Sequence, residues 1–105
     1  PGPAGLTMAA ITEEQVETVR GLVASIPSGR VSTYGDIADA AGLSSPRIVA
    51  WIMRTDSSDL PWHRVIRASG RPAPHLETRQ LERLRAEGVL ADDGRVSLRE
   101  YRHTF

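Results

Sequence analysis

Residues 34–54 read Tyr-Gly-Asp-Ile-Ala-Asp-Ala-Ala-Gly-Leu-Ser-Ser-Pro-Arg-Ile-Val-Ala-Trp-Ile-Met-Arg, and they carry the strongest fold signal in the chain. A short helix is predicted over about residues 34–41, with Gly42 in the stop position. Ser45 as N-cap and Pro46 at the first helical position then predict a second helix, which continues to the end of the stretch. Two helices joined by a tight turn that contains glycine indicate a helix-turn-helix.

The second of these helices has two different faces. Its apolar residues form the predicted inner face, which consists of Ile48, Val49, Ile52 and Met53. The opposite face takes the residues at i, i+3, i+4 and i+7, namely Arg47, Ala50, Trp51 and Arg54. Outward-facing arginines on the second helix of such a motif are typical of a DNA-binding surface.

Local signals also predict the segment that precedes the motif. A helix begins after Thr12, where Thr-Glu-Glu-Gln matches a capping box, and its apolar stripe runs to Ile26. Pro27-Ser28-Gly29 ends this helix, and residues 31–33 are expected to be extended.

The segment that follows the motif is predicted to be loop-rich over residues 55–74 and helical over about residues 77–87. Residues 89–91 and 95–98 flank an Asp-Asp-Gly turn, which predicts a small wing-like hairpin. The expected fold class is therefore mainly α with a small β-hairpin, a winged helix-turn-helix-like domain.

Charge is distributed unevenly along the chain, although its 105 residues include 13 arginines and 13 acidic residues and no lysine. Residues 1–46 have a net charge of −3, residues 47–75 of +3 and residues 76–105 of zero. A basic middle segment is the pattern expected of a local nucleic-acid site. The alternative is that an arginine-rich genome has scattered solvated charges along the chain.

Several classes of function are excluded by composition. Cysteine is absent, which removes disulfides, cysteine-ligated metals and a thiol nucleophile. His63, His75 and His103 do not have a metal-ligand spacing, so we expect no metal. Neither a bilayer-spanning apolar run nor a signal peptide is evident, and the expectation is a soluble cytoplasmic protein. Residues 1–8 are interpreted as a cloning remnant or a disordered start, and residues 9–105 as a single domain.

Three blocks that occur in order carry a family resemblance. Residues 26–38 read Ile-Pro-Ser-Gly-Arg-Val-Ser-Thr-Tyr-Gly-Asp-Ile-Ala, residues 46–50 read Pro-Arg-Ile-Val-Ala, and residues 61–66 read Pro-Trp-His-Arg-Val-Ile. Together they resemble the C-terminal DNA-binding domain of the O6-alkylguanine-DNA alkyltransferases. Trp62 stands where that family has its alkyl-accepting cysteine. This departure resembles the alkyltransferase-like proteins, which bind alkylated guanine in DNA without repairing it.

The resemblance extends over about residues 12–105 and implies DNA-binding roles for particular residues. Tyr34 matches the tyrosine that rotates the phosphate of the target nucleotide, and Arg47 matches the arginine that fills the space left by the flipped base. Ser45 and Ala50 suit the close approach of this helix to the minor groove. Trp51 is larger than the residue usual at its position and is expected at the same surface.

The resemblance also implies a lesion pocket, whose expected residues are Tyr34, Trp62, His63, Arg64, Arg71 and His75. Trp62 would form a flat wall for the base or its alkyl group, and Arg64 would brace the same motif. His63 and Glu87 match the family's histidine and carboxylate; without a thiol to activate they are interpreted as structural hydrogen-bonding partners. A residue that stacks on the lesion is expected in the following loop, where Arg71 and His75 are both candidates.

The leading hypothesis is a non-enzymatic sensor of O6-alkylguanine in duplex DNA, without a cofactor or a membrane partner. The resemblance implies a role in passing the lesion to nucleotide excision repair proteins. We expect a monomer that is associated with the bacterial nucleoid after DNA damage. The alternatives are hydrolysis of the lesion by His63 with a water molecule, and a winged helix-turn-helix transcription factor that reads sequence in the major groove.

Overall fold

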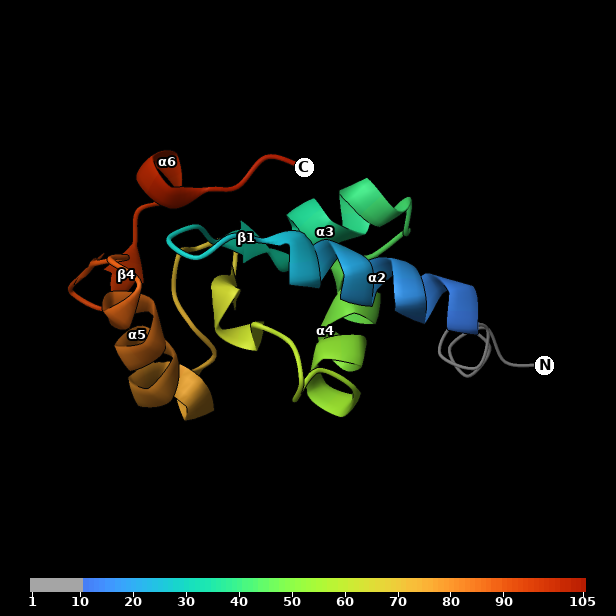
Figure 1. Ribbon diagram of the computed structural model, residues 1–105, viewed down its shortest axis with the longest axis horizontal. Coiled ribbons are helices and arrows are strands. Elements are labelled where there is room, and N and C mark those ends of the chain that lie inside the picture. Colours follow the sequence, from blue (N-terminus) through green and yellow to red (C-terminus); the bar gives the residue numbers. More distant parts are fainter. Residues whose placement is uncertain (1–10) are drawn as a thin grey trace.

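The computed structural model describes residues 11–105 and shows the predicted mainly helical fold. It has two small sheets, of which the sequence predicted only the hairpin. Residues 1–8, interpreted above as a cloning remnant or a disordered start, lie outside the described residues. Within the described residues, the N-terminal half contains the helices α2 (Glu13–Ser25), α3 (Tyr34–Ala41) and α4 (Pro46–Thr55). Figure 1 shows α2 lying across α3 and α4 at one end of the molecule.

Local caps set the boundaries of these helices, and those at Thr12, Gly42 and Ser45 are the ones that the sequence predicts. Thr12 caps α2 and Thr33 caps α3, each in a capping box with the residue three positions later. Gly42 ends α3 in the left-handed conformation, with φ of 70°. Ser45 then caps α4 through a 3.1 Å hydrogen bond that its Oγ accepts from the backbone of Arg47. The helix-turn-helix is thus specified by residues within the motif itself.

A short parallel sheet joins the two halves of the chain. Strand β1 (Ser32–Thr33) pairs with β2 (Val65–Ile66), so that two segments about thirty residues apart lie side by side. A single 3-10 turn, η1 (Trp62–Arg64), leads directly into β2. This pairing places the Pro-Trp-His-Arg block next to the start of α3.

The C-terminal half consists of η2 (Pro74–Leu76), α5 (Glu77–Ala86), the hairpin β3 (Ala91–Asp92) and β4 (Arg95–Val96), and α6 (Leu98–Tyr101). The hairpin is confirmed, and Asp93 and Gly94 in its turn both have positive φ.

The prediction that the second strand continues to residue 98 is wrong. Ser97 caps α6 instead, by accepting a hydrogen bond from the backbone of Glu100.

The interior consists of two apolar clusters that meet at β2. Val65 belongs to the cluster formed by α2, α3 and α4, whereas Ile66 belongs to the cluster formed with Val31, Leu84, Val89 and Val96. Successive residues of a strand point to opposite sides, so β2 contributes one side chain to each cluster. Among the described residues, no helix is long and apolar enough to cross a membrane.

Candidate nucleic-acid interface

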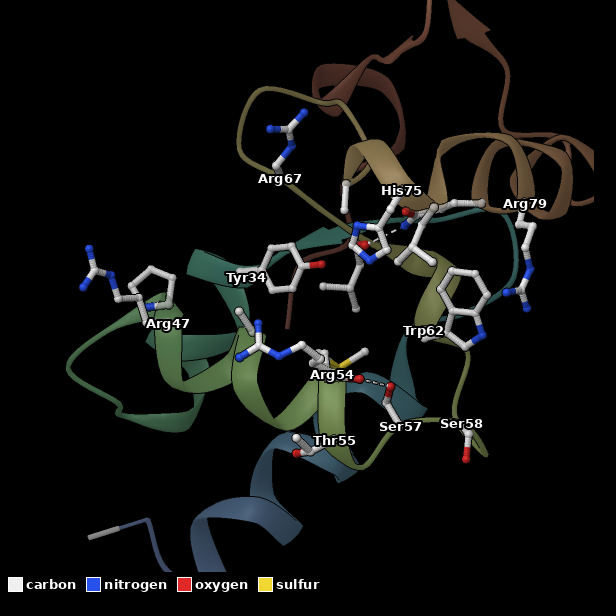
Figure 2. A pocket seen from close by; sticks show the side chains of 17 residues that line it. Tyr34, Arg47, Arg54, Thr55, Ser57, Ser58, Trp62, Arg67, His75 and Arg79 are labelled. Atoms are coloured by element: carbon white, nitrogen blue, oxygen red, sulfur yellow. Dashed lines mark hydrogen bonds between the residues drawn. The ribbon is translucent and has the colours of Figure 1, made fainter. Parts of the chain in front are cut away.

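An open pocket of about 720 Å³ lies between the helix-turn-helix and the C-terminal half. Its walls come from both halves of the chain, and the polar and aromatic side chains that line it include Tyr34, Arg47, Arg54, Trp62, Arg67, His75 and Arg79. Figure 2 shows Tyr34 and Trp62 on opposite sides of this pocket. Residues that the sequence places in three separate blocks therefore surround one cavity.

One flank of α4 faces the pocket, and it carries Arg47, Ala50 and Arg54. Trp51 does not line the pocket; it is half-buried and packs against the first apolar cluster. The reason is helical geometry, since successive residues are about 100° apart and Trp51 falls on the border beside Ile48. The predicted outer face is thus divided, and its tryptophan lies apart from its arginines.

Trp62 forms the wall of the pocket opposite Tyr34, and two arginines of α5 cover its indole. The guanidinium carbon of Arg79 lies 5.6 Å from the ring centroid, and that of Arg83 lies 5.3 Å from it. Cation–π contacts of this kind hold an aromatic side chain in one orientation. Sequence reasoning missed both arginines, although their i, i+4 spacing places them on one face of α5.

Tyr34 opens α3 and is half-buried, with its ring packed against the first apolar cluster. Burial raises the pKa of its phenol above the usual value, while the charge of Arg67 opposes the shift. The hydroxyl group therefore stays protonated at neutral pH and can donate a hydrogen bond to a phosphate.

The two candidates in the loop after β2 lie in different places. His75, at the start of η2, lines the pocket. Arg71 turns toward the hairpin, where its Nη1 donates a 3.1 Å hydrogen bond to the carbonyl of Asp93. Gly70 allows the loop to pack this closely against the hairpin, because its φ is +83° and a Cβ there would collide with the carbonyl oxygen of Val96. The geometry favours His75 over Arg71 as the loop residue that contacts a ligand.

His63 and Arg64, which the sequence predicted at the lesion pocket, do not line it and instead contact Glu87. The Nε2 atom of His63 lies 2.9 Å from Oε2 of Glu87, and Arg64 donates to both carboxylate oxygens at 3.0 and 2.6 Å. The hydrogen bonds from Arg64, supported by His63 and opposed by burial, lower the pKa of Glu87 to about 2. Arg64 also donates to the carbonyl of Ile26 at 2.8 Å. This cluster anchors the turn that presents Trp62.

Gln80 is a second anchor that the sequence did not reveal. It is 2% exposed, and its Nε2 donates to the carbonyls of His63 at 3.0 Å and Val65 at 2.7 Å. The available signal was its i, i+4 spacing to Leu84, which places a polar residue on the buried face of α5.

The charged side chains that line the pocket are all positive. Four arginines line it, whereas no aspartate or glutamate among residues 11–105 does, and residues 1–10 contain neither. In the described part of the chain, no three histidine, cysteine or acidic side chains are grouped to hold a metal ion. The site is suited to phosphates and a planar base rather than to a cation.

The fold and the site together define a helix-turn-helix-like DNA-binding domain with a pocket large enough for a nucleobase. Residues 14–89 match the family model described as 6-O-methylguanine DNA methyltransferase, DNA binding domain. The DNA base-flipping protein of Escherichia coli K12 is 41% identical over 93 residues, which cover 80% of this chain and 70% of that protein. Alkyltransferase-like protein 1 of Schizosaccharomyces pombe is 39% identical over 97 residues, which cover 86% and 88%.

Solved structures of proteins from the same family resemble the fold of this chain. The structure of S. pombe Atl1 in complex with damaged DNA containing O6-carboxymethylguanine has a TM-score of 0.76 at 34% identity, and the match covers 90% of this chain and 98% of that one. The O6-methylguanine methyltransferase of Mycobacterium tuberculosis has a TM-score of 0.63 at 30% identity over 78% of this chain and 52% of that one.

The chain belongs to the alkyltransferase-like proteins, the branch of the O6-alkylguanine-DNA alkyltransferase family in which tryptophan replaces the alkyl-accepting cysteine. With no cysteine among its 105 residues, it has no thiol to accept an alkyl group.

Proposed function

We propose that this protein is a non-enzymatic sensor that binds O6-alkylguanine in duplex DNA and holds the flipped base in the pocket beside Trp62. The observation that carries this proposal is the position of Trp62: it forms a wall of the pocket that opens next to the helix-turn-helix. The names of the relatives, DNA base-flipping protein and Alkyltransferase-like protein 1, support the same function.

The proposed complex assigns a role to each side of the pocket. The helix α4 enters the minor groove, where Ser45 and Ala50 allow a close approach and Arg47 fills the gap left by the flipped base. Trp51 borders this contact. Tyr34 rotates the phosphate of the target nucleotide, because its protonated hydroxyl lies at the start of α3 beside the pocket. Unstacking a base costs a few kcal/mol, and a plug together with a pocket offsets this cost.

Inside the pocket, the base stacks against Trp62, and His75 contacts it from the loop. Arg71 is the other loop candidate and would have to leave Asp93 to reach the base. His63, Arg64 and Glu87 support the wall from behind and do not touch the lesion. Hydrolysis by His63 is disfavoured, because its Nε2 is engaged by Glu87 and the residue does not line the pocket.

A role in handing the lesion to other proteins follows from the lack of a thiol that could accept the alkyl group. A protein that holds an alkylated base without removing it must pass the lesion to others, and we propose nucleotide excision repair proteins as those partners. We further propose that residues 9–105 act as one domain and bind DNA as a monomer, and that the protein gathers on the bacterial nucleoid in the cytoplasm after DNA damage.

The test is a titration of one duplex that carries a single O6-methylguanine against the same duplex with guanine, at one stated salt concentration. Tighter binding of the lesion, with the methylated base recovered unchanged, is the expected result. Loss of the methyl group with turnover would overturn the sensor in favour of an enzyme. Sequence-selective binding that ignores the lesion would favour the transcription factor.

A further inference from the structure

The pocket carries more positive charge than base flipping alone requires. The arginines that line it come from three elements: Arg47 and Arg54 from α4, Arg67 from the loop after β2, and Arg79 from α5. None of the four forms an ion pair with a carboxylate within residues 11–105, and residues 1–10 contain no acidic residue. Their positive charges are therefore not neutralised within the protein.

Arg79 differs from the other three in its position. Arg47, at the start of α4, lies on the side of the pocket that faces the helix-turn-helix, whereas Arg79 lies beside Trp62 at the opposite side (Figure 2). It both lines the pocket and contacts the indole at 5.6 Å. Arg83 contacts the same indole but does not line the pocket.

We propose that Arg79 makes this pocket selective for the charge of the O6 substituent, with anionic adducts preferred over neutral ones and cationic adducts rejected. This inference rests on the proposed function, because it concerns the alkyl group of a base already held beside Trp62. The guanidinium of Arg79 can donate hydrogen bonds from its edge to a carboxylate on the adduct while its face stays on the indole. A cationic adduct meets unpaired arginines and no described carboxylate.

The experiment uses three duplexes that differ only in the O6 substituent of one guanine: carboxymethyl, carbamoylmethyl and aminoethyl. These groups are similar in size and carry charges of −1, 0 and +1 at neutral pH. Carboxymethyl should bind about fivefold tighter than carbamoylmethyl, and aminoethyl about fivefold weaker, as expected for partly exposed ion pairs. Phosphate contacts are common to all three duplexes, so their salt dependence cancels in the ratios. The remaining preference should shrink as salt is raised.

Three variants separate charge from packing. Arg79→Gln should bring the ratio of carboxymethyl to carbamoylmethyl affinity close to one, whereas Arg79→Lys should keep most of it. Arg85→Gln removes a charge from an exposed position on the same helix and should leave the ratio unchanged. Affinity for the neutral carbamoylmethyl duplex reports separately whether the indole is still held in place.

The outcomes distinguish this inference from the proposed function. If O6-methylguanine binds more tightly than guanine but the three charged and neutral adducts bind equally, charge selection is overturned and the sensor stands. An unchanged ratio in Arg79→Gln overturns the assignment to Arg79. If O6-methylguanine and guanine bind equally, both proposals fail.

Discussion

The carboxylate of Glu87 lies 2.9 Å from the imidazole of His63, although the two residues are 24 positions apart in the chain. This contact joins the end of α5 to the turn that carries Trp62, and Arg64 adds two further hydrogen bonds to the same carboxylate. A histidine and a carboxylate that would activate a thiol in an alkyltransferase are here a support for the wall of a binding pocket.

Glu87→Gln should destabilise the fold by about 3 kcal/mol at neutral pH, because it leaves a partly buried Arg64 without its counter-charge. Equilibrium denaturation with urea measures this change. Glu82→Gln, at an exposed position of α5, is the matched control and should lie within about 0.5 kcal/mol of the parent. Equal stability of the two variants would show that the cluster is not an anchor.

The same carboxylate predicts a pH dependence. Its pKa in the folded protein, about 2, is below the ordinary value of 4.5, so its contribution is complete above about pH 4.5. This contribution decreases as the pH falls from 4.5 toward the folded-state pKa of about 2, where the carboxylate is protonated in the unfolded protein and half protonated in the folded one. Unfolding free energies measured between pH 7 and pH 2 should converge for the parent and Glu87→Gln. Parallel curves would contradict the assigned pKa.

Arg47→Ala should weaken binding to the lesion duplex by about 1–3 kcal/mol and leave the thermal midpoint unchanged. Arg47 is exposed on α4 and caps nothing with its side chain, so its loss removes a DNA contact without a packing defect. Fluorescence anisotropy with labelled duplexes provides the affinity. Arg99→Ala, an exposed arginine of α6 that does not line the pocket, controls for the general loss of charge. The same loss of affinity in both variants would argue against insertion of Arg47.

Tyr34→Phe should keep the fold and reduce lesion binding. The ring packs against the first apolar cluster, and no hydrogen bond joins the hydroxyl to another described residue, so removing it should change stability by less than about 0.5 kcal/mol. Binding should weaken by about 1 kcal/mol if the hydroxyl contacts a phosphate. Calorimetry of binding and of unfolding on the same preparation tests both statements. Full affinity in Tyr34→Phe would remove the proposed contact.

Gly70→Ala should be more destabilising than Gly42→Ala, although both residues have positive φ. At Gly42 the added methyl group enters open space, and only the backbone strain of about 1 kcal/mol remains. At Gly70 it collides with the carbonyl of Val96, which adds a steric cost and brings the total to about 3 kcal/mol. Urea denaturation compares the pair directly. Equal effects would mean that the hairpin yields to the methyl group.

The helices could be predicted from the sequence because the signals that start and stop them are local. Thr12, Thr33 and Ser45 each accept a hydrogen bond from a backbone amide within three residues, and Gly42 ends its helix through its own conformation. The hairpin turn at Asp93 and Gly94 is equally local. Three short blocks, at residues 26–38, 46–50 and 61–66, carried the family resemblance.

Contacts between distant segments decided the rest. The parallel pairing of β1 with β2, the anchoring of the turn by Gln80, and the arginines over Trp62 all join segments that are far apart in the chain. Arg71 and His75 were equivalent in the sequence, and the close packing of Gly70 on the hairpin separated them. A sequence pattern within a segment specifies the secondary structure of that segment. The segments against which its side chains pack depend on the tertiary structure as a whole, and no local pattern contains that information.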